Sequence, residues 1–348
     1  MSASFRGLLG CWLVLVFTAP AMAAQPKLAT EEFMVPAADA GISLYVRNKH
    51  PVGLVAVGSE KILLYVHGAT YPSETAFDLR LNGLSWMDYI AQRGYDVYLV
   101  DIRGYGRSTR PPQLNLPADQ NEPVVRTDTA VKDVGSVVDF ILKRRQVRKL
   151  NLLGWSWGTV TMGWYTAQHN DRVEKLVLLA PLWLGRTAPL AAPAPKLGAY
   201  RTVTRDAAKT RWLAGVPESK RADFLPAGWF EAWADATFAT DPVGAAMTPP
   251  VLRAPNGVMA DSRDYWNRGM PLYDPADIRV PTLLAHAEWD ADLPNSMFYA
   301  YFDKLVNTPY KRAVQIGEGT HTVLLEKNRM QLFREVQQFL DDKVEVGQ

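Results

Sequence analysis

The chain has 348 residues, of which 48% are apolar and 21% charged, as in an ordinary globular protein with room for one large domain or two modest ones. Its 38 Lys and Arg residues nearly balance its 36 Asp and Glu residues, which gives a formal net charge of +2. Because the positive charges are also scattered along the chain, the composition excludes an electrostatic case for a nucleic-acid partner.

The first 23 residues have the pattern of a secretory signal peptide. Arg6 gives a positive start, residues 8–17 form an apolar run, and residues 21–23 (AMA) provide a small-x-small cleavage site. We therefore expect an exported protein, periplasmic or secreted, with no stable membrane insertion after cleavage. The alternatives are a retained anchor, for which the run is short of the roughly 20 apolar residues of a spanning helix, and lipidation at Cys11.

Cys11 is the only cysteine of the chain. If the signal peptide is removed, the mature protein contains no cysteine. A disulfide, a cysteine nucleophile and a thiolate metal site are then excluded.

Between residues 42 and 180, strand-like and helix-like segments alternate. Apolar runs and period-2 alternation predict strands, and 3.6-residue spacing predicts helices. Such alternation predicts a mostly parallel sheet with helices on both faces. The predicted strands are 42–48, 61–68, 95–101, 149–154 and 173–180, and the predicted helices are 83–93, 127–145 (with Thr127 or Asp128 as N-cap) and 158–169.

The alternation stops at Pro181. Residues 181–275 are rich in Ala, Pro and Trp and show short helical pieces but no convincing strand, so we predict a mainly helical cap. The core, residues 24–180, then resumes at 276–348. Its expected elements there are strands at 281–290 and 310–316 and helices at 295–306 and 328–342.

Four motifs follow predicted strands in a fixed order. They are His67-Gly-Ala-Thr70, residues 101–108 (DIRGYGRS), Gly154-Trp-Ser-Trp-Gly158, and a late Asp…His pair. In this order they resemble the α/β-hydrolase family over most of residues 40–342. A lone G-x-S-x-G is weak evidence, but between a buried strand and a helix it predicts a sharp turn that exposes the hydroxyl of Ser156. Flanking glycines permit that strained turn.

A serine hydroxyl needs a base to become a nucleophile. Five histidines are present: His50, His67, His169, His286 and His321. The first precedes the core strands, the second belongs to the HGAT motif, the third ends the helix after Ser156, and the fourth lies in a strand. His321, on a glycine-flanked loop after the last strand, is where the family resemblance places the base.

Three acids follow the predicted strand 281–290 or lie at its end, and any of them could orient the histidine. They are Glu288, Asp290 and Asp292. The family pattern sets this Asp four residues before a proline, which favours Asp290 with Pro294. Its role would be to fix the imidazole tautomer and stabilise the imidazolium.

The resemblance also implies an oxyanion hole. One donor would be the backbone N–H of Trp157, and the other that of Ala69, just after His67-Gly68. Asp101 and Arg103 have two interpretations: a structural salt-bridged brace, which we favour, or an arginine that binds a substrate carboxylate.

Aromatic side chains are candidates for the substrate pocket. We select Tyr71, Trp155 and Trp183, and also the ring of Trp157, because it follows the nucleophile. Each cap tryptophan can instead simply pack the cap onto the core. The cap carries eleven Lys and Arg against nine Asp and Glu, which argues against a strongly charged substrate; its tryptophans are Trp183, Trp212, Trp229, Trp233 and Trp266.

These features predict a serine hydrolase that acts through an acyl-enzyme, without a metal or another cofactor. The expected substrate is a small-molecule carboxylic ester or lactone of modest size with an apolar part. A proline-iminopeptidase-like aminopeptidase is an alternative, although those enzymes carry HGGPG where this chain has HGAT. Two further possibilities are a carbon–carbon bond hydrolase and a non-enzymatic binding module.

Overall fold

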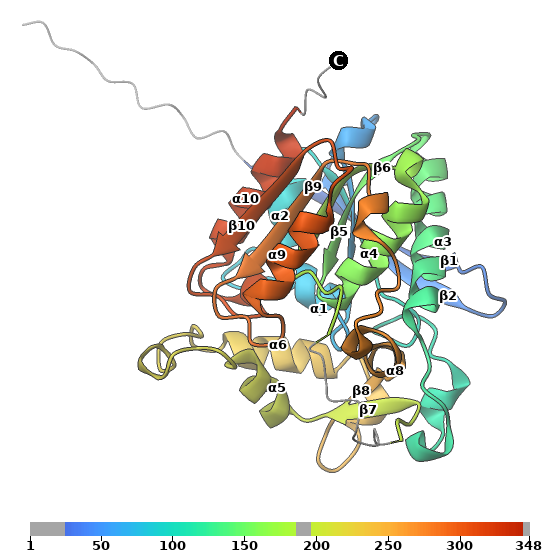
Figure 1. Ribbon diagram of the computed structural model, residues 1–348, viewed down its shortest axis with the longest axis vertical. Coiled ribbons are helices and arrows are strands. Elements are labelled where there is room, and N and C mark those ends of the chain that lie inside the picture. The colour runs from blue at the N-terminus through green and yellow to red at the C-terminus, as the bar shows by residue number, and fades with distance from the viewer. Residues whose placement is uncertain (1–24, 186–195, 344–348) are drawn as a thin grey trace, which may run out of the picture.

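The computed structural model describes residues 25–185 and 196–343, so the predicted signal peptide lies outside the described residues. Eight strands form one sheet in the spatial order β1-β2-β4-β3-β5-β6-β9-β10 (Figure 1). β2 pairs antiparallel with β1 and β4, and all other pairs are parallel, which confirms the predicted sheet. The strands are β1 (Leu28–Pro36), β2 (Ser43–Pro51), β3 (Ile62–Val66), β4 (Asp96–Val100), β5 (Leu150–Trp155), β6 (Val173–Leu179), β9 (Thr282–Ala287) and β10 (Lys311–Ile316).

Helices cover both faces of this sheet. Alternate residues of β3 point to opposite faces: Leu63 and Tyr65 pack in one apolar cluster with residues of α2 and α10, whereas Ile62, Leu64 and Val66 pack in a second with residues of α3, α4 and α9. These helices are α1 (Ser73–Phe77), α2 (Trp86–Ala91), α3 (Thr127–Arg145), α4 (Trp157–Gln168), α9 (Asn295–Lys304) and α10 (Arg329–Asp341).

Several details of the core differ from the sequence prediction, among them the short helix α1, which was not predicted. The edge strand β1, Leu28–Pro36, was not predicted, because two consecutive acids, Glu31 and Glu32, interrupt its apolar pattern. The N-cap of α3 is Arg126, not Thr127 or Asp128. Thr127 is instead the first helical residue, and both its N–H and its hydroxyl donate to the Asp261 carboxylate at 2.7 Å. The carboxylate that accepts the first N–H of α3 therefore comes from the inserted segment, residues 181–275.

The cap elements lie together beyond one end of the sheet (Figure 1). The prediction that this segment contains no strand is wrong, since β7 and β8 pair antiparallel. Both are only four residues long and hold an arginine each, so neither shows the apolar alternation that identifies a strand. The cap elements are β7 (Tyr200–Val203), α5 (Arg205–Trp212), α6 (Trp229–Phe238), α7 (Pro242–Ala245), β8 (Leu252–Pro255) and α8 (Gly257–Asp264).

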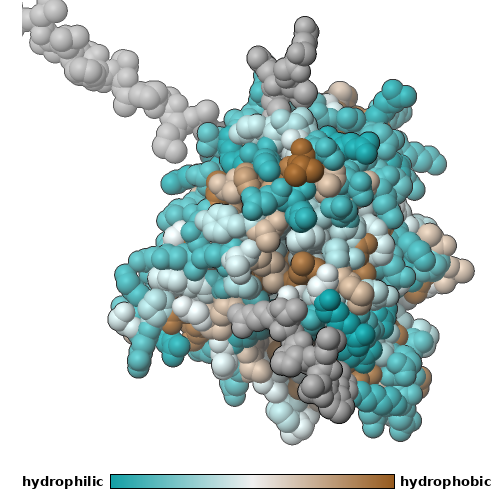
Figure 2. Space-filling model, in the orientation of Figure 1, coloured by the Kyte–Doolittle hydropathy of each residue, from teal (hydrophilic) through white to brown (hydrophobic). Residues whose placement is uncertain are grey.

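Polar residues cover most of the face shown in Figure 2, and apolar residues appear there in small separate groups. Scattered exposed apolar side chains are normal for a folded chain. Among the described helices, none combines the length and apolar character that crossing a membrane requires.

Candidate active site

Ser156 occupies a sharp turn between β5, which ends at Trp155, and α4, which begins at Trp157. Its backbone has φ 56° and ψ −119°, a conformation that costs free energy for a residue with a side chain. Neighbouring glycines make the turn possible. A Cβ on Gly158 would lie 2.6 Å from the carbonyl oxygens of Val66 and His67, and one on Gly154 would clash with the Gly158 oxygen.

The structure brings three of the predicted residues together in one hydrogen-bonded chain. His321 Nε2 lies 2.8 Å from Ser156 Oγ, and His321 Nδ1 lies 2.8 Å from Asp290 Oδ2. In the neutral imidazole, Nδ1–H therefore donates to the carboxylate and Nε2 accepts the serine O–H. The other oxygen of Asp290 accepts the backbone N–H groups of Asp292 and Leu293 at 2.9 and 3.0 Å, which fixes the carboxylate.

The competing acids take other positions. Glu288 is exposed, and its carboxylate accepts the backbone N–H of Glu318 at 2.8 Å. Asp292 Oδ2 lies 3.7 Å from His321 Nε2, on the serine side of the ring, and pairs with Arg211 at 2.6 Å. Asp290 alone among the three meets Nδ1, as the family pattern implies.

Neighbouring charges make the His321 imidazole more basic. Burial acts to lower the pKa of its imidazole, but the charge and hydrogen bond of Asp290 outweigh burial, so the pKa is raised above its usual value. The charge of Asp292 raises this pKa further, and that of Arg211 opposes the rise. The resting imidazole can thus accept a proton more readily than a free histidine.

The two predicted oxyanion donors flank Ser156. The N–H of Trp157 is the first of α4, so no earlier turn accepts it. In the described chain, the Ala69 N–H meets no acceptor either, whereas the Ala69 carbonyl accepts from Tyr105 Oη and Arg201 at 2.8 and 2.7 Å. Both N–H groups are thus available to a negatively charged oxygen.

His67 orients the peptide that carries the Ala69 N–H. Its Nε2 accepts the backbone N–H of Ile102 at 3.1 Å, so its Nδ1–H donates to the Gly68 carbonyl at 2.6 Å. The Gly68 carbonyl and the Ala69 N–H belong to the same peptide unit. Burial lowers the pKa of His67 to about 4, which keeps this neutral tautomer.

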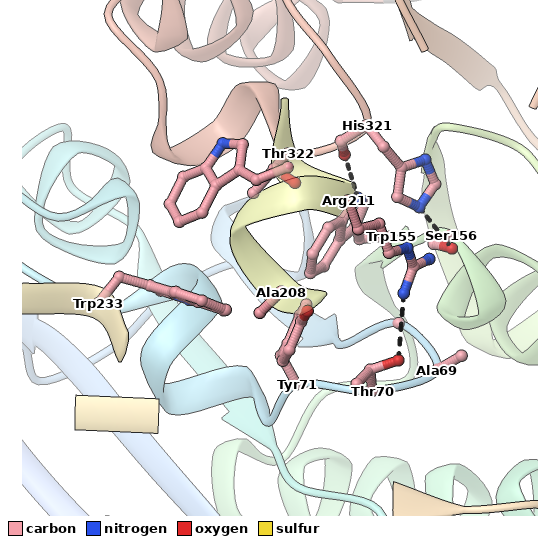
Figure 3. A pocket seen from close by; sticks show the side chains of 12 residues that line it. Ala69, Thr70, Tyr71, Trp155, Ser156, Ala208, Arg211, Trp233, His321 and Thr322 are labelled. Carbon is pink, nitrogen blue, oxygen red and sulfur yellow. Dashed lines mark hydrogen bonds between the residues drawn. The ribbon is translucent and has the colours of Figure 1, made fainter. Parts of the chain in front are cut away.

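A small cavity of about 20 Å³ opens beside Ser156 (Figure 3). The predicted Tyr71 and Trp155 line it, together with Trp212 and Trp233 of the cap. Arg211, which sequence analysis did not select, lines it as well; no local pattern distinguishes this arginine from the others of the cap.

Two predicted pocket residues do not reach the cavity. The indole N–H of Trp157 donates to Thr127 Oγ1 at 2.8 Å, so this ring packs under α3. The indole N–H of Trp183 points to the Tyr273 carbonyl at 3.3 Å, and its ring packs edge-on against Tyr301. Both predictions are wrong for the same physical reason: closeness to Ser156 in sequence, or membership of the cap, does not fix the direction of a ring.

The favoured structural interpretation of the DIRGYGRS motif agrees with the contacts. Arg103 pairs with the buried Asp133 and with Asp39, and does not line the cavity. Asp101 accepts the backbone N–H groups of Ser73 and Arg107 at 2.8 and 3.1 Å.

Among the described residues, no group of three or more His, Cys, Asp or Glu is arranged to hold a metal ion.

The model of the alpha/beta hydrolase fold family matches residues 61–328, a region that contains the elbow, Asp290 and His321. The chain belongs to the α/β-hydrolase family. This assignment confirms the family resemblance that the four motifs indicated.

Similar proteins include two human proteins. Lipase member M is 32% identical over 160 residues, which cover 44% of this chain and 37% of the lipase. Serine hydrolase BPHL is 31% identical over 121 residues, which cover 35% of each chain. The matched regions thus span little more than a third of these relatives.

A solved structure is similar over more of this chain than the two human proteins are. The serine hydrolase involved in carbazole degradation, the CarC enzyme, superimposes with a TM-score of 0.59, over 90% of this chain and 99% of that one, at 18% identity. At that identity the likeness shows the fold alone.

Proposed function

We propose that this α/β-hydrolase cleaves a carboxylic ester or lactone of modest size through an acyl-enzyme on Ser156. One observation carries the proposal: the hydrogen-bonded series Ser156–His321–Asp290 lies beside two backbone N–H groups and opens on a cavity. A nucleophile, its base, the orienting acid and an anion site are the parts that acyl transfer requires.

The first half of the reaction forms the acyl-enzyme. Ser156 Oγ bonds to the substrate carbonyl carbon while His321 Nε2 takes the hydroxyl proton. The carbonyl oxygen becomes an oxyanion, which the N–H groups of Ala69 and Trp157 stabilise. The bond between the carbonyl carbon and the alcohol oxygen then breaks, and the imidazolium returns the proton to the departing oxygen.

The second half releases the acid. A water molecule gives a proton to His321 and attacks the acyl carbon. The same N–H groups hold the second oxyanion. When it collapses, the bond to Oγ breaks, Ser156 recovers its proton from the imidazolium, and the carboxylic acid leaves.

The cavity walls support a substrate with an apolar part. Much of the cavity wall is aromatic carbon surface, against which an alkyl or aryl group would pack. This surface belongs to Tyr71, Trp155, Trp212 and Trp233. A cavity of about 20 Å³ holds roughly one water molecule, so we expect cap side chains to move when an ester binds.

Hydrolysis of p-nitrophenyl esters tests the proposal. Esters from acetyl to palmitoyl, benzoyl esters and a lactone would be offered to the wild-type protein, Ser156→Ala, and Ser219→Ala as the control, because Ser219 is exposed on the cap. Ser156→Ala should lose activity by about 10⁴-fold or more, whereas Ser219→Ala should match the wild type.

The chain-length profile would then measure the pocket. A folded wild-type protein that turns over no ester or lactone contradicts the proposal. Release of proline from a dipeptide would then support an aminopeptidase, and cleavage of a diketone a carbon–carbon bond hydrolase.

We also propose that the chain is exported, on the basis of residues 1–23. Expression with its own N-terminus, followed by fractionation and mass measurement, should give a protein outside the cytoplasm that begins near residue 24. An uncleaved cytoplasmic product would contradict export.

A further inference from the structure

Two cap arginines converge on one hydroxyl at the rim of the cavity. Arg201 of β7 donates from Nη2 to Thr70 Oγ1 at 2.9 Å and to the Ala69 carbonyl at 2.7 Å. Arg211 of α5 donates from Nη1 to the same Thr70 oxygen at 3.3 Å. Figure 3 shows the Arg211 guanidinium between Thr70 and Ser156. Thr70 directly follows the residue that carries the Ala69 oxyanion donor.

Thr70 has one unused donor. Its oxygen accepts from both guanidinium groups, and its own O–H donates to no atom of the described residues, although the residue is only 4% exposed and lines the cavity. A buried hydroxyl normally finds an acceptor. The two charged donors also polarise this O–H and make it a stronger donor. We therefore expect the Thr70 O–H to donate to an acceptor that occupies the cavity.

The two arginines have different partners. Asp292 pairs with Arg211 through Oδ2, at 2.9 Å to Nε and 2.6 Å to Nη2. Arg201 forms no ion pair within the described chain, because its acceptors are the Pro255 and Ala69 carbonyls and the Thr70 hydroxyl. Burial lowers the pKa of Arg201, and the charge of Arg211 acts in the same direction, but an arginine remains protonated. Arg211 thus lies in the field of Asp292 and Asp290, whereas Arg201 has no carboxylate partner among the described residues.

An unpaired arginine does not by itself mark a site. Arg110 and Arg329 also donate only to backbone carbonyls in the described chain. Neither lines the cavity of Ser156, and neither shares its acceptor with a second guanidinium. The Arg211 side chain is 42% exposed, so it stands where a substrate would first meet the site.

We propose that Thr70, Arg201 and Arg211 form a seat for an anionic group of the substrate, a carboxylate a few bonds away from the scissile ester. The Thr70 O–H and the Arg211 guanidinium donate to the carboxylate, and Arg201 supplies the second positive charge behind Thr70. This inference rests on the proposed esterase function and specifies its substrate class. The near balance of charges in the whole cap argues against a charged substrate, but it does not reveal that Arg201 lacks a carboxylate partner among the described residues.

The test compares charged esters with neutral ones of equal shape. Ethyl hydrogen succinate, glutarate and adipate would each be paired with the ethyl ester in which an isopropyl group replaces the carboxylate. All six release ethanol, so one coupled assay measures every kcat/KM. The wild-type protein should prefer at least one charged ester by about tenfold or more, and added salt should reduce that preference.

Variants locate the seat. Thr70→Val and Arg211→Gln should reduce kcat/KM for the preferred charged ester by about ten- to a hundredfold more than for its neutral partner. Thr70→Ser, which keeps the hydroxyl, should retain the preference. Arg205→Gln is the matched control on α5, since Arg205 is exposed and pairs with Asp235 away from the cavity.

Three outcomes separate the possibilities. Equal losses on charged and neutral esters, in folded Thr70→Val and Arg211→Gln, would overturn the seat and assign Thr70 to the oxyanion hole. A wild-type preference for the neutral esters would overturn it as well. Failure to hydrolyse any ester would instead refute the esterase function, independently of these variants.

Discussion

The indole N–H of Trp155 donates to the backbone carbonyl of His321 at 2.9 Å. Trp155 is the last residue of β5 and immediately precedes Ser156, so this bond ties the position of the proposed nucleophile to that of His321, its proposed base. Its ring also lines the cavity. A single tryptophan thus has a packing role and a positioning role.

Trp155→Phe tests the positioning role. The variant keeps an aromatic ring but leaves the His321 carbonyl without its donor, so we expect a loss of about 1–3 kcal/mol in the free energy of unfolding and a fall in kcat on the order of tenfold. Denaturant unfolding and ester kinetics measure the two effects. Trp266→Phe is the control, because the buried Trp266 indole N–H has no hydrogen-bond partner among the residues that the structure describes. Equal losses in both variants would assign the effect to ring volume.

The glycine at the start of α4 should tolerate no side chain. A Cβ at Gly158 would lie 2.6 Å from the backbone oxygens of Val66 and His67, neither of which can move without distorting β3. We expect Gly158→Ala to lower the free energy of unfolding by several kcal/mol or to prevent folding.

Gly135→Ala is the matched comparison. Gly135 lies inside α3, and a Cβ there would meet only a ring carbon of Tyr165 at 3.6 Å, an ordinary contact. This change should stabilise the protein by up to about 1 kcal/mol, because alanine favours helices over glycine. Thermal unfolding of the two variants distinguishes them, and a stable Gly158→Ala protein would contradict the packing described for the elbow.

Local signals explain which parts of the site were predictable from the sequence. The turn at Ser156 needs small neighbours, so it leaves a G-x-S-x-G pattern between a strand and a helix. His321 and Asp290 follow strands whose order the apolar runs reveal, and the family pattern distinguishes Asp290 from Asp292. The alternation of strand and helix patterns is also a local signal, and it predicted the parallel sheet.

Contacts between distant segments left no such signal. β7 and β8 are short and are defined by pairing with each other across some fifty residues of cap. The direction of the Trp157 and Trp183 rings depends on the packing of α3 and of Tyr301, which no local spacing encodes. The convergence of Arg201 and Arg211 on Thr70 joins two cap elements to a core loop, so only the folded chain shows it.

Asp292→Asn should shift the pH dependence of activity. The carboxylate of Asp292 raises the pKa of His321, and Arg211, which it partly neutralises, lowers that pKa. In the proposed mechanism His321 must be neutral to act as a base, so we expect kcat/KM to rise as the pH passes through this pKa. Removing the charge of Asp292 lowers the pKa, so the acid limb of the profile should move to lower pH.

The profile of kcat/KM against pH with a neutral ester measures this shift. Asp303→Asn, a substitution of an exposed acid on α9, should leave the limb in place. A limb that stays fixed or moves to higher pH in Asp292→Asn would show that the charge of Asp292 does not act on His321 as its position implies.

Glu326 links the cap to the loop of the base and should make stability depend on pH. Its Oε1 accepts the indole N–H of Trp212 at 2.8 Å, and its Oε2 accepts the backbone N–H of Thr320 at 2.9 Å. Burial raises the pKa of this carboxyl from 4.5 to about 7, against the opposing effect of those hydrogen bonds.

The sign of the effect follows from the raised pKa. The folded state holds the proton more tightly than the unfolded state, so the stabilisation is complete below about pH 4.5 and is lost as the pH rises through 7. A shift of this size corresponds to roughly 3 kcal/mol of unfolding free energy. The amide introduced by Glu326→Gln cannot titrate, so this component should disappear in that variant.

Urea unfolding between pH 4.5 and 8 measures the difference. The difference in free energy of unfolding between the wild-type protein and Glu326→Gln should change by on the order of 3 kcal/mol across this range. The wild-type protein should become more stable, relative to the variant, as the pH falls. Glu218→Gln, a change of an exposed cap carboxylate, should give a curve parallel to the wild type. If the Glu326→Gln curve is parallel too, Glu326 titrates alike in the folded and unfolded chains, and its contacts with Trp212 and Thr320 hold an ordinary carboxylate.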